Sequence, residues 1–400
     1  MKRRLDPSSI ALPVIVGATI LIPVFILMLL KIDRGMGEFG LTHYYFTYDS
    51  EFLRRAFIGE ALRLTNFPMS NMSVSLLYST VVALYLVALA TAVAVIFERT
   101  QIFYKALLLA FIIYCPGVGL HFSYSGFGYL DIFHVLLSGL GLIAISSLGF
   151  TGAIIFSMFL TAIGLLIHES GLLVLVPVLI AAISLKFPQR FGFIQAIAFF
   201  AGATVLTTII WHYGGVDKLS FDEHMLSLKA TADDPNEIVR SAVIVHFRDL
   251  AENVGLLLPR TNSWYWWQHI KFIVLASPFL FLIGRYAISL NAHYIQENNR
   301  AGGVLLIFAI VSPLALYILG HDFFRWWSIV MNNFFLLLLF GCASSSVVQA
   351  NLITALTKGR SLVIFAIGLG ALSGGIASHV SFSIHTSPVG MFLRQVQPLF

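Results

Sequence analysis

The feature that most constrains this chain is a series of long apolar blocks separated by short polar segments. Hydrophobic residues make up 58% of the 400 residues and charged residues only 11%, whereas about a quarter of a soluble domain is charged. Each block approaches the roughly 20 residues with which a helix crosses a bilayer, and the alternating polarity of a membrane β-barrel is absent. We therefore expect an all-α, polytopic transmembrane helical bundle that forms a single membrane domain over residues 1–400.

Eleven blocks have the length and hydropathy of a span. They are residues 10–30, 73–97, 102–116, 131–149, 152–167, 171–186, 193–211, 270–290, 303–320, 327–349 and 361–380. The first block follows a basic start, but it exceeds the core of a signal peptide and no small-residue cleavage site follows it. We expect it to be retained as the first span.

The orientation follows from the lysines and arginines of the short connections. With the N-terminus in the cytoplasm of a bacterial inner membrane, all but one of the short inside loops are basic, as the positive-inside rule requires. Two long connections, 31–72 and 212–269, then lie on the outer, periplasmic face. Nearly every histidine and acid outside the termini falls on this face, which predicts a functional site there.

The first outer loop carries candidate site residues in segment 48–60, which we expect to form a short amphipathic helix at the membrane surface. Asp49 at its start and Glu51 are carboxylates suited to general-base work. Arg54 and Arg55 could grip a phosphate through forked hydrogen bonds. The alternative is that these charged side chains only form the solvated face of an interfacial helix.

A second candidate is the polar break at 168–170, between two apolar blocks. An imidazole and a carboxylate at a span end, here His168 and Glu169, are costly unless they face water or a polar cavity. The alternative is a helix cap in which Glu169 or Ser170 starts the next helix.

A third candidate begins at His321 and Asp322 and continues to Arg325. On a helix these side chains share a face and can pair, so Arg325 could bind a phosphate while an acid orients it. The alternative is a structural ion pair between helices, and Trp326 and Trp327 fit an interfacial aromatic belt.

Weaker signals are Asp131 and His134, three residues apart after an aromatic stretch at 121–129. No metal-binding motif accompanies them, so we predict no cofactor, and a divalent metal has no motif to support it. Cys115 and Cys342 lie in or beside apolar blocks and predict no disulfide. A nucleotide-binding loop and a nucleophile elbow are also absent, and the basic residues favour lipid headgroups over nucleic acid.

Together, the outer-facing spans, the acidic and arginine-rich first loop, the His168-Glu169-Ser170 break and the His321-Asp322-x-x-Arg325 element resemble polytopic GT-C glycosyltransferases. The nearest likeness is to bacterial O-antigen and surface-polysaccharide polymerases. This resemblance implies a polyprenyl phosphate or diphosphate sugar donor, a glycan acceptor, work at the periplasmic face and partner proteins of a polysaccharide export pathway. Asp49 would be the base, with Glu51, Glu169 and Asp322 in reserve, and Arg54, Arg55 and Arg325 would hold the phosphate.

Two other functions stay open from the sequence. A transporter or flippase of a lipid-linked or anionic solute would use the same arginines, but it should carry ionisable groups at mid-membrane depth, and the span centres are nearly free of them. A membrane acyltransferase acting on glycans would use His168 or His321 to activate a hydroxyl.

Overall fold

The computed structural model describes residues 7–49, 51–97, 101–248, 252, 263–297, 299–318 and 323–373. Within these ranges the chain consists of helices and loops, with no strand. Among these residues, each of the eleven apolar blocks overlaps a helix. The corresponding helices are α1 (Pro7–Arg34), α4 (Asn71–Ile96), α5 (Ile102–Tyr114), α6 (Asp131–Ser147), α7 (Phe150–Ile167), α8 (Gly171–Val174) with α9 (Val176–Lys186), α10 (Phe193–Tyr213), α14 (Ser263–Gln296), α15 (Arg300–Val311) with η6 (Ser312–Ile318), α16 (Phe323–Ser344) and α18 (Arg360–Ser373).

The protein has the helices of a multi-pass membrane protein. Within the described residues, six segments are long and apolar enough to cross a bilayer, and a seventh counts if α17 (Ser346–Lys358) and α18, which meet at 80°, form one span. α5, α6 and the segment Gly171–Lys186 are shorter apolar helices. The all-α membrane fold is thus confirmed, while the expected count of about eleven spans is not.

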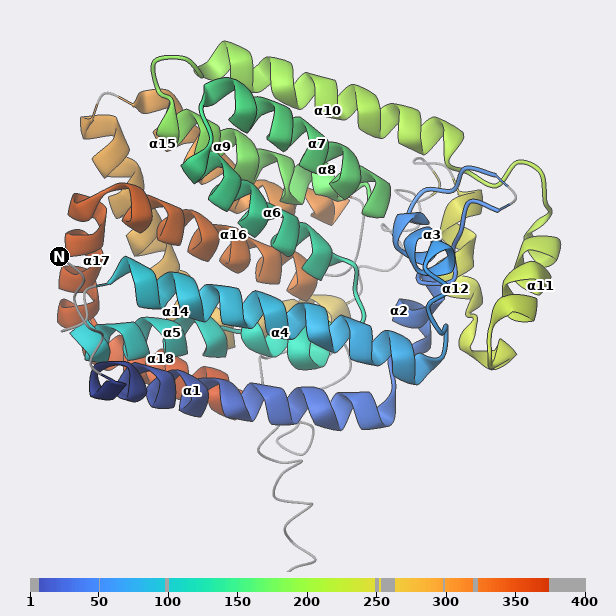
Figure 1. Ribbon diagram of the computed structural model, residues 1–400, viewed down its shortest axis with the longest axis horizontal. Helices are drawn as coiled ribbons and strands as arrows, with labels where there is room; N and C mark the ends of the chain where they lie inside the picture. The colour runs from blue at the N-terminus through green and yellow to red at the C-terminus, as the bar shows by residue number, and fades with distance from the viewer. Residues whose placement is uncertain are drawn as a thin grey trace, which may run out of the picture.

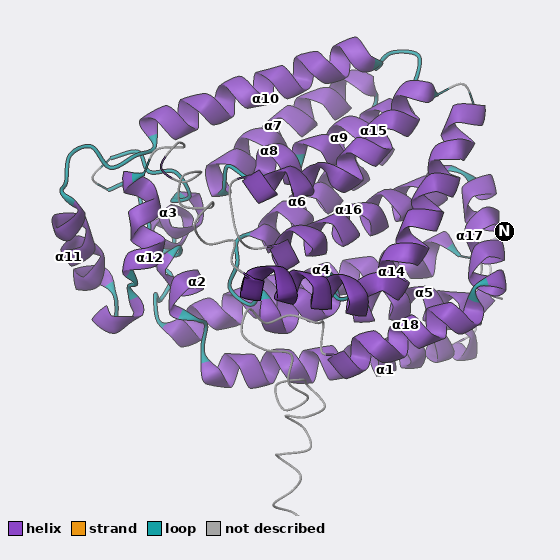
Figure 2. Ribbon diagram, turned by 180° about the vertical axis from the view of Figure 1, so that it is seen from behind, coloured by secondary structure: helices purple, strands orange, loops and turns teal. Residues whose placement is uncertain are grey.

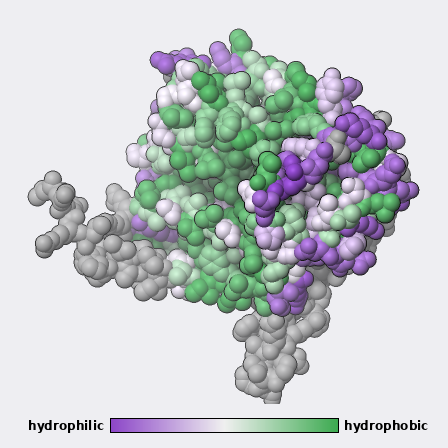
Figure 3. All heavy atoms as spheres, turned by 45° about the vertical axis from the view of Figure 1, so that its right-hand side comes forward, coloured by the Kyte–Doolittle hydropathy of each residue, from purple (hydrophilic) through white to green (hydrophobic). Residues whose placement is uncertain are grey.

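The long helices lie side by side, and one end of the bundle carries a separate group of short elements (Figures 1 and 2). These are α2 (Glu38–Thr42), α3 (Phe57–Leu64), α11 (Phe221–Thr231), η3 (Pro235–Glu237), α12 (Arg240–Val243) and η4 (Ile244–Phe247). We call residues 35–70 and 214–248 the polar cap. Hydrophilic residues gather over it, whereas the body of the bundle shows an apolar surface (Figure 3), as lipid contact requires.

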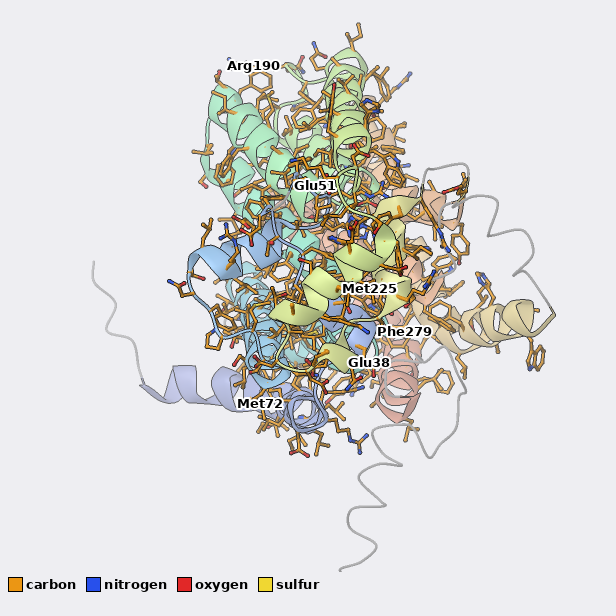
Figure 4. The ribbon with its side chains drawn as sticks, turned by 90° about the vertical axis from the view of Figure 1, so that its right-hand side faces the viewer. Glu38, Glu51, Met72, Arg190, Met225 and Phe279 are labelled. Carbon is orange, nitrogen blue, oxygen red and sulfur yellow. The ribbon has the colours of Figure 1, made fainter. Side chains whose placement is uncertain are left out.

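The two long connections predicted to share one face therefore do meet. The backbone amide of Arg54 donates to the carbonyl of Gly214 at 3.0 Å, and the amide of Asp217 donates to the Glu51 carboxylate at 3.2 Å. Seen from the cap end, Glu38, Glu51 and Met225 lie across the cap (Figure 4).

α16 forms the centre of the bundle, with 83% of its apolar window buried. Its interior side is not purely apolar, because Asn332 and Asn333 are fully buried there. The Tyr85 hydroxyl donates to Asn332 Oδ1 at 2.6 Å, and Asn333 Nδ2 donates to the carbonyls of Val174 and Ala309. Side-chain amides that hydrogen-bond to neighbouring helices fix the positions of those helices, whereas apolar packing alone would let the helices slide past one another.

The amphipathic surface helix begins later than the sequence indicates. Segment 51–56 is a loop and α3 starts at Phe57, so Asp49 does not begin a helix. Arg55 has a φ of 65°, a left-handed conformation that ends helical geometry and that a non-glycine residue adopts at a cost of about 1–3 kcal/mol. The expectation of one helix across 48–60 was wrong for this reason.

Gly59 holds α3 against the rest of the cap. A Cβ atom at Gly59 would lie 2.1 Å from the carbonyl oxygen of Phe46 and 2.5 Å from that of Tyr44. Only a residue without a side chain allows this approach between two backbones. The start of α3, and with it the loop that carries Arg55, is positioned by this contact.

Gly59→Ala should therefore destabilise the protein by about 1–3 kcal/mol, the usual cost of overpacking. The matched control is Gly202→Ala in α10, where a Cβ meets nothing within 4 Å and helix propensity improves by up to about 1 kcal/mol. Thermal unfolding in one detergent would compare them. Equal melting temperatures for both variants would contradict this role of Gly59.

Candidate functional site

A cavity of about 570 Å³ lies where the polar cap meets the membrane helices. Its wall comes from four places: the cap, the break after α7 together with α8, one face of α10, and the helices η6 and α16. The lining residues are Phe39, Arg55, His168, Glu169, Ser170, Leu172, Leu173, Thr204, Thr207, Thr208, Trp211, His212, Val245, Leu316, Arg325 and Trp326. Charged and imidazole groups thus share one space with apolar and aromatic walls.

Arg55 and Glu169 form a buried ion pair in this wall. Arg55 Nε donates to both carboxylate oxygens at 3.1 and 3.0 Å, and Nη2 donates to Oε1. Burial by itself would raise the pKa of Glu169, but the paired Arg55 guanidinium holds that pKa well below its usual value. Glu169 is therefore an anion at neutral pH, and the pair joins the first cap loop to the break after α7.

His168 lies beside this pair, also buried. Its Nδ1 accepts a hydrogen bond from the backbone amide of Ser170 at 3.0 Å, so the neutral ring carries its proton on Nε2. Burial first and Arg55 second lower the pKa of His168 well below its ordinary value. His168 is accordingly a neutral hydrogen-bond donor through Nε2.

Arg325 lies in the first turn of α16 and pairs with Asp131, the first residue of α6. Nη2 donates to Oδ1 at 3.0 Å, and Nε donates to Oδ2. The guanidinium carbon is also 4.9 Å from the ring centroid of Tyr129 and 4.8 Å from that of Trp326. This geometry joins α6 to α16 and orients the arginine at the cavity wall.

Of the predicted site residues, the structure brings together Arg55, His168, Glu169 and Arg325. Arg54 does not line the cavity. It is buried, donates to the carbonyls of Val245 and Arg248, and lies over the Trp211 ring at 4.1 Å. Those contacts connect the two halves of the cap.

Asp49 and Glu51 also lie outside the cavity lining. The Asp49 side chain is 59% exposed and pairs with Arg63 at 3.0 Å. Glu51 accepts the backbone amides of Asp217 and Lys218. His321 and Asp322 lie outside the described residues.

Sequence reasoning missed three parts of the site. Asp131 was noted only beside His134, and nothing local marks it as the partner of a residue 194 positions away. Trp211 closes one wall. The stripe Thr204, Thr207 and Thr208 on α10 was detectable, because polar residues at helical spacing in an apolar helix mark one face.

Among the residues that the structure describes, no three histidine, cysteine, aspartate or glutamate side chains gather in a way that could hold a metal ion. Comparisons with protein-family models, with curated proteins and with solved structures found no match for this chain. The function must therefore be inferred from the site itself.

Three buried histidines, His43 and His246 in the polar cap and His168 beside it, make the stability of this end of the protein depend on pH. Burial and then Arg55 lower the pKa of His43 to about 3, and the same two causes lower the pKa of His168 and of His246. Unfolded histidine titrates at about 6.5, so below that pH the unfolded chain binds more protons than the folded one. The stability is thus complete at neutral pH and falls as the pH drops from about 6.5.

His246→Phe should reduce this acid sensitivity. Neither ring nitrogen of His246 has a hydrogen-bond partner, and the ring packs edge-on against Phe46 at 4.3 Å, so phenylalanine fits. The slope of unfolding free energy against pH between 6.5 and 5 should fall by up to about 1.4 kcal/mol per unit. The control is His293→Phe, half-buried on α14; an unchanged slope in His246→Phe would refute the assignment.

Proposed function

We propose that this protein is a membrane glycosyltransferase or polysaccharide polymerase that takes glycosyl units from a polyprenyl phosphate or diphosphate donor. The observation that carries the proposal is that two guanidinium groups, those of Arg55 and Arg325, line one cavity with apolar and aromatic walls. Such a cavity suits a ligand with an anionic phosphate and a hydrocarbon chain. The proposed donor has both parts.

The chemistry of arginine supports this use. A guanidinium has five N–H donors in a planar fork that matches phosphate oxygens, and Arg55 uses Nε and Nη2 for Glu169. Two arginines in one space can balance the charge that develops on a departing phosphate. Each is held by a buried carboxylate, so its position does not depend on the ligand.

The cavity walls support a lipid-linked donor. Leu172, Leu173, Leu316 and Trp326 line the cavity with the α10 face, and α10 is the candidate span with the least burial, 17% of its window. A hydrocarbon chain would pass beside α10 from the bilayer while its phosphate reaches the arginines. The acceptor glycan would approach from the polar cap, which we place on the periplasmic side of a bacterial inner membrane.

Arg55→Lys and Arg325→Lys should each lower turnover about 10²–10³-fold, because an ammonium keeps the charge but not the fork. The measurement is surface-polysaccharide chain length in a deletion strain that expresses each variant. Arg240→Lys is the matched control, since Arg240 lies over Phe221 in the cap and not in the cavity.

Three outcomes would contradict the proposal. Full chain extension in both cavity variants would remove the arginines from the reaction. Loss of extension only in Asp49→Asn or Glu51→Gln would move the site to the first loop. Transport of an intact lipid-linked sugar across liposomes, with no new glycosidic bond, would favour the flippase instead.

The proposed orientation can be tested with cysteines at the two ends of the bundle. Ser227→Cys on α11 and Thr354→Cys on α17 are both exposed, and the native Cys115 and Cys342 are buried. An impermeant maleimide should label Ser227→Cys in intact spheroplasts, and Thr354→Cys only after lysis. The reverse pattern would place the polar cap in the cytoplasm.

A further inference from the structure

A second, smaller chamber lies behind the two arginines. Its volume is about 30 Å³, enough for one water-sized group such as a hydroxyl. Phe39, Arg55, His168 and Arg325 line both this chamber and the large cavity. The arginines therefore lie at the boundary between two spaces, as a phosphate site would lie between a donor and an acceptor.

Among the described residues, His43 is the one histidine that lines the small chamber but not the large cavity, together with Gly40, Gly128, Tyr129 and Leu130. It follows α2, is 6% exposed and lines only the chamber. Its Nδ1 lies 2.8 Å from the carbonyl oxygen of Phe39, and a carbonyl only accepts, so Nδ1 carries the proton and Nε2 the lone pair. His168, on the same chamber, has the opposite tautomer.

We propose that His43 is the general base of the glycosyl transfer and that the small chamber receives the attacking hydroxyl of the acceptor. In this step the acceptor oxygen bonds to the anomeric carbon as its proton passes to His43 Nε2. The bond from the anomeric carbon to the donor phosphate breaks, and the phosphate keeps the electron pair beside Arg55 and Arg325. His43 then returns its proton to water. His168 donates from Nε2 to a phosphate oxygen.

The charges around His43 make the base depend on the donor. The ionisable groups that face it are Arg55, Glu169, His168, Arg325, Tyr129 and His246. Without ligand, burial and then the arginines hold the pKa of His43 near 3, too low for an effective base. An anionic donor beside both arginines offsets the part of this lowering that the arginines cause, so the pKa of His43 is higher with a donor present than without one.

This assignment rests on the proposed function and predicts proton uptake on binding. The probe is inorganic pyrophosphate, titrated at pH 6 into the purified full-length protein in two buffers of different protonation enthalpy. His43→Asn keeps an amide N–H for the Phe39 carbonyl and removes the Nε2 lone pair. Wild type should take up more protons than His43→Asn, by up to one per site, and by linkage it should also bind pyrophosphate more tightly at pH 6 than His43→Asn does.

His224→Asn is the matched control. His224 is buried in the cap, where its ring stacks on Phe46, but it lines neither the chamber nor the cavity. It should keep the wild-type proton uptake. His43→Gln, which removes the Nδ1 donor as well, is a second variant if His43→Asn does not fold. Turnover should fall about 10²–10⁴-fold in either His43 variant and stay unchanged in His224→Asn.

The outcomes separate the two proposals. Pyrophosphate that does not bind to wild type, or binds equally well to Arg55→Gln and Arg325→Gln, would overturn the proposed function and this assignment with it. Binding that depends on both arginines, with equal proton uptake in wild type and both His43 variants, would overturn the base alone. Normal turnover in His43→Asn would likewise overturn the assignment of His43 as the base.

Discussion

Two buried ion pairs organise the functional end of this protein. A guanidinium at the edge of an apolar bundle is tolerated only if an acid compensates its charge. Without the acid, the free energy lost by desolvating the charge exceeds the free energy gained from packing. Arg55 with Glu169 ties the cap to the break after α7, and Arg325 with Asp131 ties α16 to α6. Their requirement for a partner determines which helix ends meet.

The same pairs account for the character of the cavity. Both arginines are held in place by carboxylates. The backbone of Arg55 has a left-handed conformation that non-glycine residues seldom adopt. A strained backbone conformation of this kind persists only where surrounding contacts hold it in place, and such residues are common at binding sites. Guanidinium N–H donors held rigidly beside apolar walls suit a ligand with a phosphate and a hydrocarbon chain, and they link the fold to the proposed lipid-phosphate chemistry.

The sequence predicted the helices well and the contacts between them poorly. Each of the eleven apolar blocks overlaps a helix in the part of the chain that the structure describes, because a bilayer leaves each segment to satisfy its own backbone hydrogen bonds. The predicted helix at 48–60 was shifted because hydrophobic spacing does not reveal a left-handed residue such as Arg55. Four of the predicted polar residues line one cavity. Asp131, however, was only a weak candidate and His43 was not identified, since their roles depend on residues far along the chain.

By itself, the sequence determined that the chain is an all-α membrane protein and that its histidines and acids collect in a few loops and span ends. Those properties are local: hydropathy and helix periodicity depend on neighbours within one or two turns. Only the tertiary structure decided which acid pairs with which arginine, which arginine lines the cavity and which ring nitrogen of His43 carries its proton. These depend on the packing of helix ends, which no local pattern encodes.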